Sequence, residues 1–113
     1  MRIRDYGVQV GSLTCGRLNK ITDVPGVRVG HATIHDEAHH TGVTVIMPCE
    51  DNMFASKLTA ASYVLNGFGK TQGLVQVDEL GTLETPIALT NTLNVGKVHD
   101  ALVGYMARRC EED

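Results

Sequence analysis

Four of the chain's five histidines lie within twelve residues, in the segment HATIHDEAHHTG at positions 31–42. On a helix, His35 and His39 would share one face, which is how the H-E-x-x-H motif of zinc proteases presents two metal ligands. That motif has a glutamate directly after the first histidine, whereas this sequence has Asp36. The flanking sequence must therefore decide whether the segment is helical and could hold a metal ion.

The residues on both sides of the histidine segment are typical of strands rather than of a helix. Val27 and Val29 precede it, and Val43 and Val45 follow. Polar residues are the usual content of a loop between strands. A metal site also needs a second layer of hydrogen-bonding groups to hold its ligands, which nothing nearby supplies. We therefore interpret residues 31–42 as a connecting loop closed by Gly42, and we predict no metal and no other cofactor.

The segment ALTNTLNVG, residues 88–96, is a second place where chemistry could occur. An apolar strand ends there, polar side chains gather, and a helix begins whose first amides point back toward them. Such a junction can bind an anion or a carbonyl oxygen, and Asn and Thr side chains can donate to a developing oxyanion. The alternative, which the residues alone favour, is that Asn94 or Thr92 caps the helix and Asn91 turns the chain.

A third candidate is the glycine-rich segment LNGFGKTQG, residues 65–73, which carries Lys70 between glycines. It does not match the phosphate-binding pattern G-x-x-x-x-G-K-[ST], so we interpret it as a turn with an exposed lysine. No serine lies in a G-x-S-x-G frame. His99 falls in the middle of a predicted helix, where a surface or packing role is common.

Composition places the chain among small globular domains. Its 113 residues suffice for one domain, 1–113, with no internal boundary, and the net charge of −3 gives no support for nucleic-acid binding. No apolar run approaches the length of a membrane span or of a signal peptide. The three cysteines are widely spaced, which favours reduced thiols in a cytoplasmic protein over a disulfide framework; they are Cys15, Cys49 and Cys110.

Hydrophobic periodicity predicts a mixed α/β domain in the order strand, strand, strand, helix, strand, helix. Residues 1–20 are predicted to be irregular, with turns at glycines. The expected strands are in 27–34, 41–48, 58–67 and 85–91. Residues 71–80 form a short helix that stops at Gly81, and a longer helix runs from Asn94 to about Cys110.

Several of these stretches together resemble one family. ITDVPGVRVGHATI, TGVTVIMP, LNGFGKTQGL and DELGTLETPIALTNTLNVGKVHDAL, in that order, resemble the amino-terminal part of the self-processing aminopeptidases. That family includes the L-aminopeptidase/D-esterase (DmpA-like) enzymes and the β-peptidyl aminopeptidases. The resemblance covers roughly residues 15 to 110. It implies an αββα sandwich similar to N-terminal-nucleophile hydrolases, of which this chain forms only the leading part.

The resemblance also implies a mechanism and partners. Family members cut their own precursor before a serine or an equivalent residue, and the new amino terminus supplies nucleophile and general base. The resulting acyl-enzyme is hydrolysed by water without a metal or other cofactor. The expected partners are the remaining α-chain or β-chain segment that carries the nucleophile, a peptide or amide substrate, and further copies in a homo-oligomer.

No catalytic residue is assigned within these 113 residues, because the family's nucleophile and its assisting residues lie further along the chain. Gly11-Ser12 and Gly81-Thr82 do not fit the processing site. We therefore expect an incomplete α-chain that is inactive alone. The implied substrate-cleft candidates are Asn66, Gly67, Thr90, Asn91, Thr92 and Asn94.

Two alternatives to the leading segment of an aminopeptidase stay open. One is a non-catalytic fragment or scaffold of the same fold, which we disfavour because half a sandwich would expose the apolar face of its sheet. The other is an acyltransferase of related architecture, similar to ornithine acetyltransferase. Water accepts the acyl group in the peptidase, whereas an amine accepts it in the transferase.

Overall fold

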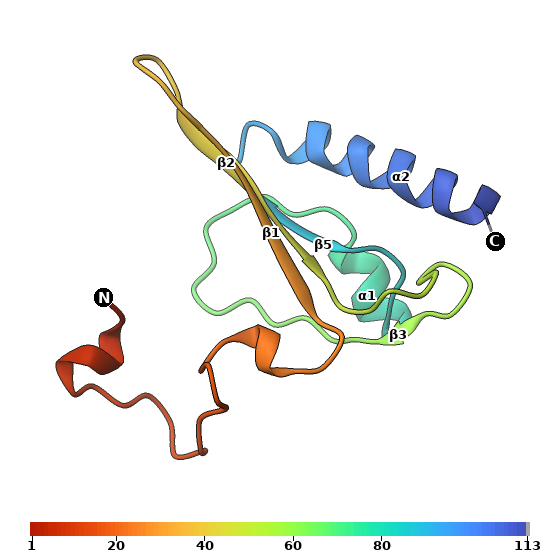
Figure 1. Cartoon of the computed structure of the whole chain (residues 1–113). Coiled ribbons are helices and arrows are strands. Elements are labelled where there is room, and N and C mark those ends of the chain that lie inside the picture. The colour runs from red at the N-terminus through yellow and green to blue at the C-terminus, as the bar shows by residue number, and fades with distance from the viewer. Residues whose placement is uncertain (113) are drawn as a thin grey trace.

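The computed structural model describes residues 1–112 and is built around a three-stranded antiparallel sheet. Its strands are β1 (Arg28–His35), β2 (His40–Met47) and β5 (Ile87–Thr90), in the spatial order β1-β2-β5. Figure 1 shows β1 and β2 as a long hairpin with β5 beside β2. The sequence predicted all three strands from their β-branched residues and, for the first, from the preceding turn at Pro25-Gly26, where Gly26 has φ +85°.

The predicted loop over residues 31–42 is wrong in its extent. β1 runs on to His35 and β2 begins at His40, so the connection is only Asp36–His39. The Asp36 carboxylate accepts the N–H groups of Ala38 and His39, which closes a tight turn and lets pairing continue to its edge. Gly42 does not close the loop but lies within β2, where a Cβ would overlap the backbone carbonyl oxygen of Ala32.

A second, two-stranded sheet pairs β3 (Leu58–Thr59) with β4 (Thr82–Leu83), and α1 (Leu74–Leu80) precedes β4. The predicted short helix and its glycine stop are confirmed, because Gly81 adopts φ +64° and its N–H bonds the carbonyl of Val77. β4 was not predicted. Two residues are too few to produce a periodic pattern.

The prediction of a strand over residues 58–67 is wrong beyond Thr59. Ala60–Leu65 are irregular, and Tyr63 is 87% exposed. The β-branched and aromatic residues in this segment favour a strand only when a partner strand is available. Leu58 and Thr59 pair with β4, and the residues after Ala60 leave that ladder.

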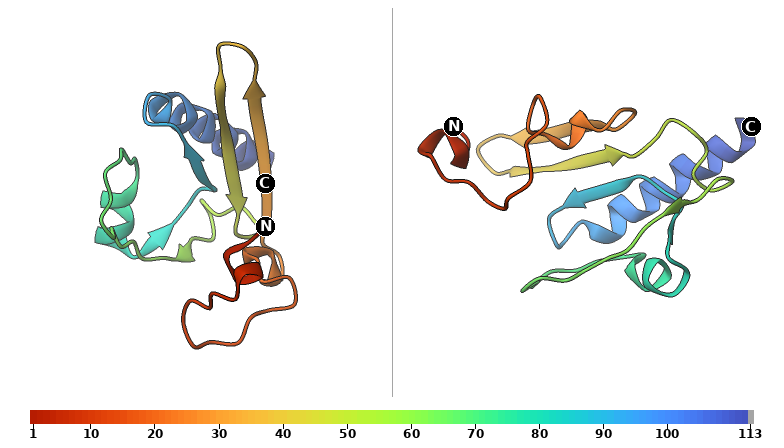
Figure 2. Two further views of the ribbon diagram at one scale, coloured as in Figure 1. Left: turned by 90° about the vertical axis from the view of Figure 1, so that its left-hand side faces the viewer. Right: turned by 90° about the horizontal axis from the view of Figure 1, so that it is seen from below.

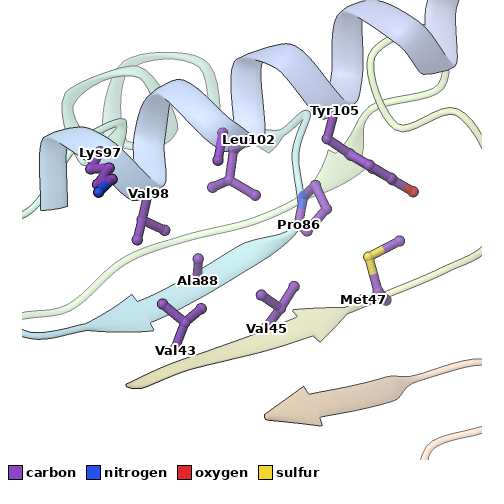
Figure 3. Close-up of a pocket in the computed structure, with 10 residues that line it drawn as sticks. Val43, Val45, Met47, Pro86, Ala88, Lys97, Val98, Leu102 and Tyr105 are labelled. Atoms are coloured by element: carbon purple, nitrogen blue, oxygen red, sulfur yellow. The ribbon is translucent and has the colours of Figure 1, made fainter. Parts of the chain in front are cut away.

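The longer helix, α2 (Val95–Glu112), confirms the prediction for the last segment and extends two residues past the expected end. An ion pair at 3.7 Å between Arg109 and Glu112 joins side chains three residues apart in its last turn. Val98, Leu102 and Tyr105 point from α2 toward the strands (Figure 3). They face Val43 and Val45 of β2 and Ala88 of β5.

The two faces of the three-stranded sheet differ in what covers them. The strand register places Val43, Val45 and Ala88 on the face that α2 covers. It places apolar residues on the opposite face as well, and two of them are well exposed, Ile87 at 40% and Leu89 at 57%. Val29 and Ile46 pair on that opposite face and are half-buried.

Residues 1–24 lie to one side of the sheet (Figures 1 and 2), and nearly all of them are exposed. They contain two short 3₁₀ helices, η1 (Ile3–Tyr6) and η2 (Ile21–Asp23). The irregular path predicted for residues 1–20 is otherwise confirmed. Asp23 holds part of the segment together, because backbone N–H groups of Leu18 and Lys20 bond its carboxylate and lower its pKa.

The described chain is more open than a closed domain of its size. Its accessible surface is 8996 Å², whereas a compact monomer of 12.2 kDa has about 6,100 Å². The Cα radius of gyration is 16.2 Å, against about 13 Å for a compact chain of this length. The fold is thus mixed α/β as predicted, with much apolar surface left uncovered. Within residues 1–112, no helix is both long and apolar enough to cross a membrane.

Candidate functional site

The junction between β5 and α2 is organised by one side chain, that of Asn91. Its Oδ1 accepts the backbone N–H groups of Leu93 and Asn94, both at 3.1 Å. Its Nδ2 donates to Thr41 Oγ1 at 2.6 Å, across the sheet on β2. Asn91 therefore turns the chain into the helix and ties that turn to the hairpin.

The neighbours of Asn91 are also fixed by hydrogen bonds. Thr90 Oγ1 donates to the carbonyl of Gly42 at 3.1 Å. The Asn94 carbonyl accepts the N–H of Val98 at 3.0 Å, which is the bond expected of a residue just before a helix. The Asn94 side chain donates from Nδ2 to Asn91 Oδ1 at 3.0 Å. Turn formation by Asn91, one of the two roles that the sequence left open, is thus observed.

Not all of the predicted cleft residues come together. Thr90, Asn91, Thr92 and Asn94 share one turn, with Asn91 and Thr92 exposed at its surface. Asn66 and Gly67 lie in the exposed 60–73 segment, which in Figure 1 swings widely away from the sheet. Asn66 adopts φ +49°, and a Cβ at Gly67 would come within 2.6 Å of Val64 Cγ1. These two residues shape a turn there.

A cleft of about 460 Å³ lies between β5, α1 and α2, and Thr90 is one of its lining residues. Its walls are largely apolar, with Leu74 and Val77 from α1 and Leu102 from α2. Polar side chains also reach it, and they come from four separate parts of the chain: Ser62, Lys70, Glu84 and His99. An apolar cleft with a few polar groups is the usual form of a small-molecule or peptide site.

Sequence reasoning missed the cleft positions of these four polar residues. It assigned surface roles to Lys70 and His99, and it gave no role to Ser62 or Glu84. Ser62 donates a short hydrogen bond to the carboxylate of Asp78 on α1. No local pattern could have identified this group, because its members are separated by loops and helices and meet only in the fold.

Glu84 is the most strongly held carboxylate of the cleft. Its pKa is lowered, mainly by a hydrogen bond from the Gln76 side chain and then by Lys57, whose Nζ lies 3.0 Å from Glu84 Oε2. Lys57 also lies over the Phe54 ring, with Nζ 4.2 Å from the ring centroid. Glu84 is therefore an ionised anchor rather than a proton donor at neutral pH.

The histidine cluster does not form the pair that helical spacing suggested. His39 Nδ1 lies 2.9 Å from Asp36 Oδ1, and His31 Nδ1 lies 2.8 Å from Thr44 Oγ1. His35 faces His40 across the hairpin. In the part of the chain that the structure describes, no three or more His, Cys, Asp or Glu side chains are grouped so that they could hold a metal ion.

A further cavity, of about 440 Å³, lies between α2 and the sheet (Figure 3). Valine, alanine and leucine side chains, Tyr105, Met47 and Pro86 form most of its lining. Although Lys97 and Tyr105 are among its lining residues, its exposed inner surface is entirely apolar, so we interpret it as incompletely filled packing space under the helix.

Comparison with known proteins identifies the family of this chain. The model of peptidase family S58 matches residues 19–113, which is most of the chain. The chain belongs to peptidase family S58. The recognition from sequence motifs of an aminopeptidase relationship is thereby confirmed.

Individual relatives and solved structures are consistent with this assignment. The chain is 40% identical to a β-peptidyl aminopeptidase, BapA, of Sphingosinicella xenopeptidilytica, covering 99% of this chain and 30% of that protein. It is 50% identical to a β-aminopeptidase structure from a Burkholderia species, with a TM-score of 0.84, covering 96% of this chain and 32% of that one. It also superimposes on the PH0078 protein of Pyrococcus horikoshii OT3 with a TM-score of 0.89, at 41% identity and 35% coverage of that chain.

The chain thus spans about a third of the length of the relatives it matches. Its mixed α/β fold is that of the corresponding part of the Burkholderia β-aminopeptidase. The expected fold class, the leading part of a sandwich of the N-terminal-nucleophile hydrolase type, agrees with this match. The β5–α2 junction and the cleft beside it lie inside the region matched by the S58 family.

Proposed function

We propose that this chain is the leading segment of a self-processing, serine-type aminopeptidase. The complete protein removes amino-terminal residues from peptides, amides or esters through an acyl-enzyme. The observation that carries the proposal is the 50% identity to a β-aminopeptidase, at a TM-score of 0.84 over nearly the whole chain. Identity at that level over a shared fold supports a shared chemistry.

In this proposal the nucleophile is the amino-terminal hydroxyl residue of a companion segment, with its own α-amino group as the general base. The hydroxyl oxygen attacks the scissile carbonyl, and the leaving amine or alcohol departs with the transferred proton. Water then attacks the ester and releases the acid. The present chain contributes binding surface rather than the attacking atom, and therefore has no activity alone.

The β5–α2 junction is the part of this chain that we assign to the substrate cleft. In this proposal Asn91 and Thr92, which directly follow the cleft-lining Thr90, border the substrate cleft, where an amide or hydroxyl can donate to the substrate carbonyl. Asn91 Nδ2 carries two N–H donors, and Thr41 uses one of them. Asn66, Gly67, Thr90 and Asn94 complete the set of proposed cleft residues.

The uncovered apolar surface supports the proposed partner. Ile87 and Leu89 present apolar side chains on the sheet face opposite α2. In an αββα sandwich, that face packs on a second sheet, which the companion segment would supply. We further propose that the complete protein assembles as a homo-oligomer and works in the cytoplasm, where its three cysteine thiols stay reduced.

The test is hydrolysis of an anilide that carries an amino-terminal β- or α-amino acid, assayed with the purified complete protein. We expect release of the aniline, and we expect this release to be lost after treatment with a serine-directed acylating reagent. A protein that is fully assembled yet releases no aniline, with water or with any added amine, would contradict the proposal. Release that depends on an added amine would favour the acyltransferase alternative.

A further inference from the structure

Two imidazoles, those of His35 and His40, lie side by side at the tip of the β1–β2 hairpin. His35 and His40 are register partners at the end of the hairpin. Their Nδ1 atoms lie 2.9 Å apart, and their ring centroids lie 4.5 Å apart with the ring planes tilted by 58°. Two nitrogen donors at this distance can share a proton, as they do here, or can share a cation.

The backbone beneath this pair is already fixed. The N–H of Asp36 bonds the carbonyl of His39 at 2.9 Å, and Asp36 Oδ1 accepts the N–H groups of Ala38 and His39 at 2.8 and 2.7 Å. Both imidazole residues are exposed, so a hydrated cation can approach them. A chelating pair on a fixed hairpin loses little conformational entropy on binding.

We propose that His35 and His40 form a two-nitrogen chelate for a divalent transition cation that prefers right-angled coordination, Ni²⁺ or Cu²⁺, with water in the remaining positions. Two nitrogens 2.9 Å apart, each about 2.05 Å from one cation, subtend about 90° at it. That is the angle between neighbouring ligands in square-planar or octahedral coordination.

Ligand chemistry disfavours cations that prefer oxygen. Mg²⁺ and Ca²⁺ prefer oxygen ligands. The neighbouring histidines are not further ligands, because His39 is hydrogen-bonded to Asp36 and His31 to Thr44. The proposed site therefore has two protein ligands, His35 and His40, and water molecules complete the coordination.

The proton balance is simple. In the free pair, one imidazole donates its Nδ1–H to the Nδ1 lone pair of the other. On binding, that proton leaves Nδ1 and water returns one to Nε2 of the same ring. The two exposed rings then turn so that both Nδ1 lone pairs converge on the cation, the net charge of the imidazoles does not change, and no oxidant or reductant is needed.

The experiment is calorimetric titration of Ni²⁺ into the purified protein, with its companion segments present, after metal is removed with a chelator. Ni²⁺ is the probe because Cu²⁺ would oxidise exposed thiols such as Cys15 and Cys110. The variants are His35→Asn and His40→Asn, each made singly. The matched controls are His31→Asn and His99→Asn, which remove an imidazole from other surfaces.

We expect one Ni²⁺ site per chain, weakened at least about tenfold by either pair variant and unchanged in the controls. The proposal is overturned if Ni²⁺ does not bind, or if binding persists when His35 or His40 is replaced. Because the readout is binding rather than turnover, it stands apart from the proposed aminopeptidase activity.

Discussion

Both faces of the three-stranded sheet carry apolar side chains, but the two faces differ in what covers them. On one face, Val43, Val45 and Ala88 lie under α2, a helix that follows β5 after a four-residue turn. On the other face, Ile87 and Leu89 remain exposed by 40% and 57%. The first face is covered by α2, which is the next element along the chain. Within residues 1–112, the second face has no such neighbour in sequence and would have to be covered by a segment from elsewhere.

If the proposed companion segment exists, this difference identifies where it would add structure. The described surface of 8996 Å² exceeds that of a compact monomer of this mass by almost half. The excess includes the opposite face of the sheet and residues 1–24, in which Leu13 is 86% exposed. The family's remaining length, about two thirds of each relative, is large enough to cover both.

The largest effect is expected from placing a charge on the uncovered face. Leu89→Asp should prevent assembly of the complete protein, because a carboxylate buried against a second sheet costs several kcal/mol. Ala107→Asp, on the exposed part of α2, should change stability by less than about 1 kcal/mol. Size-exclusion chromatography with light scattering and thermal unfolding measure both variants. Normal assembly of Leu89→Asp would mean that this face stays open to solvent.

A smaller effect is expected on the covered face. Leu102→Ala should lower the free energy of unfolding by about 3 kcal/mol, because its side chain fills the space between α2 and the strands. Val75→Ala, at a well-exposed position of α1, is the control and should cost less than about 0.5 kcal/mol. Chemical denaturation measures both. Equal costs for the two variants would show that α2 does not stabilise the sheet.

Features that depend on residues close together in the sequence could be predicted from it, whereas features that depend on residues far apart could not. The strands β1, β2 and β5, the helix α1 with its Gly81 stop, and α2 all carry local signals: alternation, glycine, proline or helical spacing. The pairing of His35 with His40, rather than with His39, depends on hairpin register. The end of β3 at Thr59 depends on a partner strand. Neither is encoded in a short window.

The candidate site divides in the same way. The polar junction at Thr90–Asn94 could be located from sequence, because an apolar strand and an amphipathic helix meet there. The bond from Asn91 to Thr41 could not, since it joins residues fifty positions apart. The cleft group of Ser62, Lys70, Glu84 and His99 is likewise assembled only by the fold.

An intermediate effect, on activity rather than on stability, is expected at the β5–α2 junction. Asn91→Ala in the complete protein should lower kcat/KM by more than about tenfold, equivalent to 1.4 kcal/mol of transition-state stabilisation. It should cost only about 1 kcal/mol of stability, since its hydrogen bonds are exposed to water. Steady-state kinetics and thermal unfolding of the same sample separate the two. Unchanged turnover would remove Asn91 from the substrate cleft.

The smallest effect is expected in the pH dependence of stability. Gln76 and then Lys57 lower the pKa of Glu84 below its ordinary 4.5. This interaction therefore stabilises the fold above pH 4.5 and is lost as the pH falls through the lowered value. Glu84→Gln should reduce stability at pH 7 by at most about 1 kcal/mol, and the difference should shrink on acidification. A difference that grows on acidification would contradict this assignment.

The central claim is that this chain is one segment of a self-processing enzyme, and intact mass measured under denaturing conditions tests it most directly. The account predicts a second polypeptide in the purified active protein, whose amino-terminal residue is Ser, Thr or Cys. Amino-terminal sequencing of that polypeptide identifies the residue. Aminopeptidase activity from a sample that contains only the 113-residue chain would contradict the account.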